Sequence, residues 1–222
     1  MEDLMDKIIG FGAIVLVVAV FVLAIYFNRQ SKKELRTWAK RHGWDNPEHA
    51  DDLQSAWRAT QETGGAPTRI VRKQFPEGEV FAFENTYSSS PGSIINKHVV
   101  GVDLGTDVPT MVLQDPRRAG FSKSEVPVEI DDPAFSRRWS VHTLAEDDVA
   151  AVRRFLAAAP DFRQRLTGDD PLLTGTVIAL ADQHLMLGIG GDRDLAQIQP
   201  ATALARELAS ALQIDPPATG AR

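Results

Sequence analysis

The sequence predicts an α+β protein, in which an N-terminal transmembrane helix is followed by an antiparallel-sheet domain with packing helices. Three observations carry this prediction. An uncharged apolar stretch of 20 residues stands near the start of the chain. From Thr68 the apolar residues follow strand-like spacing, with short turns between the segments. Helical spacing returns in the C-terminal half, so that helices follow strands instead of alternating with them.

Composition places the chain among globular proteins of ordinary size. It has 222 residues, of which 43% are hydrophobic and 24% charged, and its net charge is −6 at pH 7. These values exclude a wholly disordered chain, a collagen-like chain and a multi-span membrane protein. The sequence contains no cysteine, which excludes a disulfide framework, a thiol nucleophile and cysteine-held metal centres.

Residues 8–27 form the apolar stretch, which follows a short acidic tail at residues 1–7. Fourteen of its twenty residues are Ile, Leu, Val or Phe, and none is charged. A helix of this length spans about 30 Å, the hydrocarbon thickness of a bilayer. A cleaved secretion signal would need a basic start and a small-residue cleavage site, and neither is present. We therefore expect a retained signal-anchor and a single-pass protein.

The charges that flank residues 8–27 predict the orientation. Three acidic residues and one lysine precede the stretch, whereas six basic residues and one glutamate follow it before Gly43. Lys and Arg near a span stay on the cytoplasmic side. The expected location is the bacterial inner (plasma) membrane, with the N-terminus outside and the C-terminal domain in the cytoplasm. A reversed topology, with the domain as an extracytoplasmic sensor, is the weaker alternative.

Residues 28–65 are expected to form a basic juxtamembrane helical neck. Gly43 suits the end of its first helix, and Asn46-Pro47 suits the start of a second. The basic face would lie against anionic lipid, or Leu35 and Trp38 would pack on the globular domain; the sequence leaves both open. The helical spacing is carried by Leu35, Trp38, Ala39 and His42 in the first helix and by Leu53, Ala56 and Trp57 in the second.

Residues 66–215 are expected to form the α+β globular domain, and residues 216–222 a disordered tail. A capping box at Thr143–Glu146 predicts a helix that ends before Pro160, and a short helix stopped by Gly168 follows. A last helix is expected near Pro200–Leu212. The predicted strands are 68–75, 79–87, 98–104, 110–114, 126–130 and 138–141, and a hairpin of 176–181 and 184–189 across Asp182-Gln183.

Charge excludes nucleic acid as a partner. Residues 1–43 hold 7 basic and 4 acidic groups, whereas residues 44–222 hold 17 and 26. Residues 44–222 therefore have a net charge of −9, and an acidic globular domain would repel a phosphate backbone.

Two glycine-containing segments invite a nucleotide-binding interpretation. Val100–Thr106 (VGVDLGT) resembles the first phosphate loop of the sugar-kinase, actin and heat-shock ATPase superfamily, but no second phosphate loop or adenosine motif accompanies it. Gly188–Asp192 (GIGGD) lacks the third glycine of a dinucleotide loop. A strand ending in a turn is the favoured interpretation of both.

Other polar residues also have structural interpretations. The histidines show no metal-ligand spacing, and adjacent carboxylates suit turns and helix starts. Arg137-Arg138-Trp139 would suit an anion site, but a strand edge with Phe135 and Trp139 packed inward is favoured. No G-x-S-x-G segment makes a nucleophile of the serines in Ser88–Ser90. The histidines are His42, His49, His98, His142 and His184, and the acidic pairs are Asp131-Asp132, Asp147-Asp148 and Asp169-Asp170.

Several short, mostly apolar motifs follow one another along the chain. The order is similar to that of a group of uncharacterised actinobacterial single-pass membrane proteins with a small α+β domain. The resemblance implies architecture and carries over no catalytic residue. The motifs are Trp38-Ala39, Gly43-Trp44, Trp57, Phe81–Tyr87, Val99–Val112 with Pro109, and Phe135–Val141.

These observations favour a membrane-tethered cytoplasmic binding or scaffold protein. Its expected partners are the bilayer through residues 8–27, anionic lipid at the neck and a protein of unknown identity. No catalytic, cofactor-binding or metal-ligating residue is assigned and no cofactor is expected. The alternative is a hydrolase or transferase whose site is assembled from scattered Asp, His and Ser residues; a deep pocket with several titratable groups would favour it.

Overall fold

The structure, a computed structural model, describes residues 26, 29–47, 51–58, 67–76, 78–90, 93–116, 126–190 and 195–212. Contacts divide the chain into one unit that ends at Gly43 and a second that begins at Trp44. In the first unit, residues 29–42 are helical, as the apolar spacing predicts. The His42 and Trp38 rings stack 4.7 Å apart, and Gly43 ends the helix with a φ of 68°.

The membrane prediction requires correction. Among the described residues, no helix is long and apolar enough to cross a membrane. The predicted single-pass signal-anchor in the bacterial inner membrane, with a cytoplasmic domain, is therefore contradicted. Apart from Tyr26, residues 8–27 lie outside the described residues, as do both predicted tails. The domain boundaries at 65/66 and 215/216 stay predictions.

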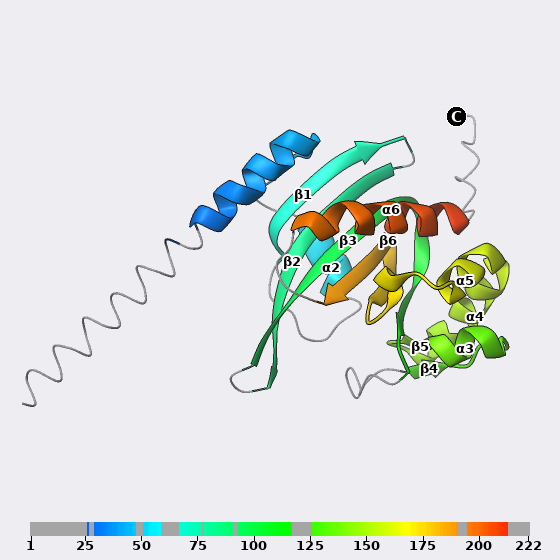
Figure 1. Ribbon diagram of the computed structural model, residues 1–222. Helices are drawn as coiled ribbons and strands as arrows, with labels where there is room; N and C mark the ends of the chain where they lie inside the picture. Colours follow the sequence, from blue (N-terminus) through cyan, green and yellow to red (C-terminus); the bar gives the residue numbers. More distant parts are fainter. Residues whose placement is uncertain are drawn as a thin grey trace, which may run out of the picture. The chain divides into compact units, whose positions relative to one another are not determined.

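The second unit is built on an antiparallel sheet, as expected, with helices packed against it (Figure 1). Within the described residues the strand order is β1-β2-β3-β5-β4, and β6 also pairs with β3. The prediction of an α+β fold with an antiparallel sheet is confirmed. The strands are β1 (Thr68–Phe75), β2 (Gly78–Ser90), β3 (Ser93–Gln114), β4 (Val126–Val128), β5 (Ser140–Thr143) and β6 (Val177–Gly190).

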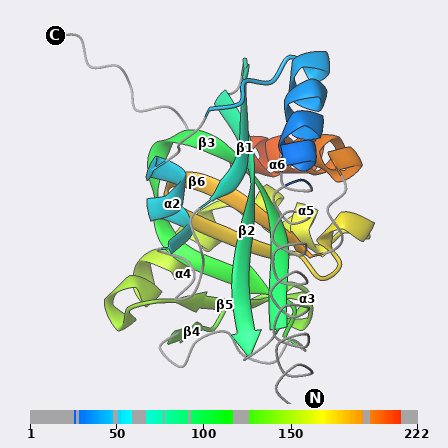
Figure 2. The same cartoon turned by 90° about the vertical axis from the view of Figure 1, so that its left-hand side faces the viewer.

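Strand β6 folds back on itself. A Cβ built at Gly188 would lie 3.6 Å from the carbonyl oxygen of Val177. A straight strand would hold these two residues about 35 Å apart. The reversal occurs at Asp182, which has a φ of 52°. The predicted hairpin across Asp182-Gln183 therefore exists, and Figure 2 shows its halves as neighbouring ribbons.

The two halves of β6 lie between the two halves of β3. The first half of β3 pairs with the C-terminal half of β6, for example Val99 with Gly188, and the second half pairs with the N-terminal half, for example Leu113 with Ile178. The predicted strands 98–104 and 110–114 are thus two parts of β3, joined by residues that pass around the tip of β6. There the Gln183 amide donates to Asp107 Oδ1 at 3.1 Å.

Helices cover both faces of the sheet. Helix α2 (Asp51–Arg58) lies behind the sheet in Figure 1 and places Trp57 edge-on to Phe83, 5.9 Å between ring centroids. Helix α6 (Ile198–Ala211) crosses in front and buries the predicted Leu204 and Leu208. The other helices are α3 (Pro133–Arg138), α4 (Val149–Ala158) and α5 (Pro160–Thr167), with short 3-10 turns η1 (Glu146–Asp148), η2 (Pro171–Leu173) and η3 (Leu195–Gln197).

Two local predictions are wrong. The capping box fails because Thr143 belongs to β5, where its hydroxyl donates to the Thr110 carbonyl at 2.9 Å; α4 begins only at Val149. The predicted strand 138–141 begins instead at Ser140. Arg138 is instead the last residue of α3. Asp132 caps the start of this short helix by accepting two backbone N–H groups at 3.1 Å.

Candidate functional site

A groove of about 930 Å³ lies beside β4 and β5. Its volume falls within the range of about 300–1,000 Å³ that small-molecule sites occupy. One side is the end of the sheet with the segment that follows β4, and helices α3, α4 and α5 supply the rest. The lining residues are Pro127, Val128, Glu129, Ile130, Asp131, Ser136, Trp139, Ser140, Val141, His142, Arg153, Ala157 and Arg163.

The position of the groove wall depends on Asp132 and Trp139. One carboxylate oxygen of Asp132 caps α3, and the other accepts from Arg163 Nη1 at 2.7 Å, so that α3 is joined to α5. The Trp139 indole donates to the Leu166 carbonyl at 2.9 Å, which fixes the residue after α3 to the same helix. These bonds hold the buried Trp139 ring in the floor of the groove.

Polar side chains in the groove donate to the protein backbone. The Ser136 hydroxyl donates to the Ile130 carbonyl at 3.0 Å, and the Ser140 hydroxyl donates to the Gln114 carbonyl at 3.2 Å. Arg153 Nε donates to the Glu129 carbonyl at 3.0 Å. These bonds support the walls, and a serine nucleophile would instead need its proton directed at a base.

The edge of the sheet at the groove is closed to strand addition. β4 is the last strand of its edge and pairs only with β5 among the described residues. Its middle residue, Pro127, has no backbone N–H to offer, and the Glu129 carbonyl already accepts from Arg153. Proline at an edge position is a common protection against further β-pairing.

The titratable side chains that line the groove differ in how far they are buried. Burial lowers the pKa of His142, so its imidazole is neutral at pH 7. The carboxylates of Glu129 and Asp131 belong to exposed residues. The Arg163 side chain is 20% exposed, and its buried Nε has no hydrogen-bond acceptor within the described part of the chain. Arg163 is thus a largely desolvated cation with an unused donor.

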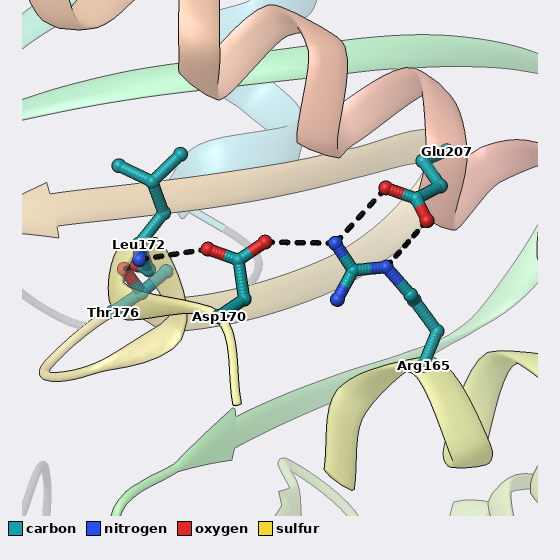
Figure 3. A network of polar contacts seen from close by, with 5 residues as sticks. All are labelled: Arg165, Asp170, Leu172, Thr176 and Glu207. Carbon is teal, nitrogen blue, oxygen red and sulfur yellow. Dashed lines mark hydrogen bonds and ion pairs between the residues drawn. The ribbon is translucent and has the colours of Figure 1, made fainter. Parts of the chain in front are cut away.

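Away from the groove, Arg165 joins α5 to α6 and to η2 (Figure 3). Its Nε and Nη2 donate to the two Glu207 oxygens at 2.6 and 2.9 Å, and Nη2 also donates to Asp170 at 2.7 Å. These hydrogen bonds raise the pKa of Arg165 against the effect of burial. Burial acts to raise the pKa of Asp170, but its bonds from Arg165 and the Leu172 N–H outweigh burial and lower it.

The histidines singled out by sequence do not gather into a site. Among the described residues, no group of three His, Asp or Glu side chains could hold a metal ion. His184 packs edge-on to Phe81, 5.4 Å between ring centroids, and His98 is buried opposite Glu84 in the sheet. Of the four described histidines, only His142 lines the groove, and His49 lies outside the described residues.

The glycine-containing segments belong to strands. Val100–Thr106 lies within β3, where Asp103 Oδ1 accepts the Gly105 N–H at 2.8 Å and makes a tight turn inside the strand. The favoured interpretation placed a strand end there, whereas the strand continues to Gln114. Gly188 belongs to β6, and residues 191–194 lie outside the described part of the chain.

The acidic pairs and the Arg-Arg-Trp motif take structural roles. Asp132 caps α3 and Asp170 caps η2, as predicted for these pairs. Phe135 and Trp139 are buried as predicted, but they flank the end of a helix and not a strand edge. All three residues of the motif line a second hollow of about 280 Å³. The other lining residues are Asp115, Leu173, Thr174 and Gly175.

Sequence analysis missed Arg153 and Arg163. They lie ten residues apart on different helices, and the groove brings them beside residues 127–131. No local pattern marks such a set, because neither arginine belongs to a motif with fixed spacing. The one available signal was that the segments forming α4 and α5 are rich in arginine and follow the predicted strands 126–130 and 138–141.

No family model and no curated protein matches the sequence. Among solved structures, the fold is similar to the crystal structure of the mycobacterial trehalose monomycolate transport factor A, TtfA. The TM-score is 0.53 at 15% sequence identity, and the match covers 84% of this chain and 96% of that chain. At this identity the match shows a shared small α+β fold, which supports that part of the actinobacterial resemblance.

Proposed function

We propose that this protein is a non-catalytic binding factor that holds a partner in the groove beside β4 and β5. The observation that carries the proposal is that polar side chains in the groove are bonded to the protein backbone, while apolar side chains line it. The hydroxyls of Ser136 and Ser140 and the Nε of Arg153 bond to backbone carbonyls, whereas Val128, Ile130 and Val141 supply an apolar lining. Such a surface suits binding by burial of apolar area.

The similar structure supports the same class of function. TtfA is described as a transport factor for trehalose monomycolate, and the match spans nearly all of that chain. We propose a comparable accessory role in transport, in which this protein binds a lipid or a protein and does no bond-breaking chemistry. A scaffold for a protein partner and a lipid-binding factor both fall within this proposal.

A photo-crosslinker placed in the groove tests the proposal. Ala157 is exposed and lines the groove, whereas the next residue, Ala158, is exposed on the same helix outside it. Benzoylphenylalanine at Ala157 should give a discrete adduct in growing cells, and the same group at Ala158 should not. Mass spectrometry of the adduct identifies lipid or protein. Equal labelling at both positions would refute a binding role for the groove.

The hydrolase or transferase alternative has one supporting observation. Ser140 and His142 stand two apart on β5, so both project from the same face of the strand and both line the groove. A fluorophosphonate probe would label Ser140 in an active hydrolase, and Ser140→Ala would abolish the label. The binding proposal expects no labelling of either the wild type or the variant.

A further inference from the structure

We propose that two copies of this chain associate through the projecting end of the β2–β3 hairpin and join their sheets there. The inference goes beyond the proposed binding function and does not involve the groove. The projecting ribbon consists of residues 85–90 of β2 and residues 93–96 of β3, which pair with each other as far as Ser90 and Ser93.

Within the described residues, the projecting ribbon has no neighbouring strand on either side. β1 accompanies β2 only as far as Glu84, which lies opposite Thr68, and β6 accompanies β3 only as far as Lys97, which lies opposite Gly190. The ribbon extends past the end of β6 (Figure 1). Each of its edges therefore presents backbone N–H and C=O groups to which the described part of the chain offers no strand.

Hydrogen bonds on β1 show which residues of β2 direct their backbone groups toward this open edge. Arg72 exchanges two backbone bonds with Asp45 on the far side of β1, at 2.8 and 2.9 Å. Because backbone groups alternate in direction along a strand, the preceding residue, Val71, must face β2, where it lies opposite Ala82. Every second residue of β2 from Ala82 onward therefore directs its N–H and C=O toward the side of β1.

This alternation places Thr86 and Ser88 on the open edge. The Thr68 hydroxyl donates to the Glu84 carbonyl at 3.3 Å, which confirms that the even-numbered residues of β2 face β1. Beyond Glu84 the β1 side is open, so Thr86 and Ser88 are the next residues available for pairing with an added strand. The register between β2 and β3 is regular up to Ser88 and shifts only after it.

The other edges of the sheet are protected. On β4, Pro127 offers no backbone N–H. On β1, Asp45 occupies both backbone groups of Arg72, and the Asn46 amide donates to the Ile70 carbonyl. Proteins commonly protect their sheet edges against pairing in these ways. The edge of the projecting ribbon lacks such protection within the described chain, which indicates that another strand pairs with it.

Charge favours a second copy as the owner of that strand. Residues 85–96 (NTYSSSPGSIIN) contain no charged residue, although 24% of the chain is charged. Charged side chains on an edge strand oppose pairing, and like charges directly opposite each other are destabilising. Because each copy has a net charge of −6, an uncharged projecting segment is where two copies meet with the least like-charge repulsion.

The sequence of the open edge is also complementary to itself. A two-fold axis at Tyr87 would place this residue opposite Tyr87 of the second copy, and Thr86 opposite Ser88 of the second copy. Aromatic pairs and Thr–Ser pairs are both favourable across antiparallel strands. Thr86 and Ser88 also carry the outward backbone groups, so the two symmetric pairs would exchange about four hydrogen bonds.

A single introduced cysteine tests this register, because the chain has no other thiol. Copper phenanthroline treatment of cells that produce full-length Tyr87→Cys should give a disulfide-linked dimer. The opposed Cα atoms would lie about 4.5 Å apart, within the range that a disulfide spans. Ala203→Cys, at an exposed position of α6, is the control and should crosslink roughly tenfold less.

Three results of this experiment would overturn the proposal. They are the absence of a crosslinked dimer of Tyr87→Cys, equal crosslinking of Tyr87→Cys and Ala203→Cys, and crosslinking of Tyr87→Cys only to other proteins.

Two further variants, made in the Tyr87→Cys chain, separate strand pairing from chance contact. Ser88→Pro removes an outward N–H and leaves the bonds between β2 and β3 in place, and Thr86→Lys brings like charges together across the interface. Each should lower the crosslinked fraction at least fivefold. Ala158→Lys, at an exposed position of α4, should leave it unchanged. If Ser88→Pro disrupts the hairpin, Thr86→Lys still decides, and undiminished crosslinking of Thr86→Lys would contradict the assignment.

Discussion

Arg165 and Glu207 form a two-point ion pair between α5 and α6, with Nε to Oε1 at 2.6 Å and Nη2 to Oε2 at 2.9 Å. The same guanidinium reaches Asp170, whose other oxygen accepts the Leu172 N–H at 2.9 Å. One side chain therefore connects two helices and the turn that leads into β6. Substitution of Arg165 or Asp170 therefore tests how much this network contributes to the stability of the fold.

Arg165→Gln should destabilise the fold by about 1–2 kcal/mol, because its charge-assisted hydrogen bonds to two carboxylates are lost while the carboxylates of Glu207 and Asp170 remain. Urea unfolding at pH 7 measures the change. Arg154→Gln, at an exposed position of α4, should change the free energy of unfolding by less than about 0.5 kcal/mol. Similar losses for both variants would show that the network adds nothing specific.

Asp170 should make stability depend on acid pH. Its pKa in the folded protein is lowered below the ordinary value of 3.8, so its ionised form stabilises the fold. The difference in unfolding free energy between wild type and Asp170→Asn should be constant above about pH 5. It should shrink as the pH falls below 3.8 and through the lower folded-state pKa. Urea titrations from pH 3 to 7 would show the opposite trend if the sign were wrong.

Gly101→Ala should severely impair folding. A Cβ at this position would lie 2.4 Å from Phe81 Cζ and 2.7 Å from the Leu185 carbonyl oxygen, and the backbone oxygen cannot move freely. We expect a loss of about 3 kcal/mol or more, measured by thermal unfolding. Gly168→Ala is the control, since its Cβ would meet only Arg165 atoms at 3.3 Å and beyond. A near-neutral Gly101→Ala would disprove the close approach of β2, β3 and β6.

Asp182 should tolerate glycine and reject valine. Its φ of 52° at the reversal of β6 is disfavoured for residues with a branched Cβ. Asp182→Gly should therefore be neutral or slightly stabilising, and Asp182→Val should cost about 1–2 kcal/mol. The melting temperatures of the two variants check this order. If valine is tolerated as well as glycine, the strand does not reverse as described.

Local patterns predicted the elements that depend on neighbouring residues. The predicted strand 68–75 matches β1, because the β-branched residues Thr68, Ile70 and Val71 and the flanking turn are local signals. The stop at Gly168 and the buried face of α6 were also predicted, for the same reason. The capping box at Thr143 failed because a distant carbonyl, that of Thr110, binds its hydroxyl.

Arrangements between distant segments were beyond sequence analysis. Predicted strands 98–104 and 110–114 were located, but nothing local indicates that β6 lies between them. The groove has the same origin: residues 127–131 meet Arg153 and Arg163 only through packing on the sheet. The membrane prediction rested on the apolar residues 8–27 and on the charges that flank them, whereas among the described residues no helix is long and apolar enough to cross a membrane.

The interleaving of β3 and β6 also sets an order of assembly. During synthesis the two arms of β3 leave the ribosome well before residues 177–190 exist. Until this late segment arrives, the centre of the sheet is missing and the arms expose apolar residues such as Val100 and Met111, which are buried in the finished fold. Premature termination anywhere before Gly190 should therefore yield an aggregation-prone product rather than a smaller stable protein.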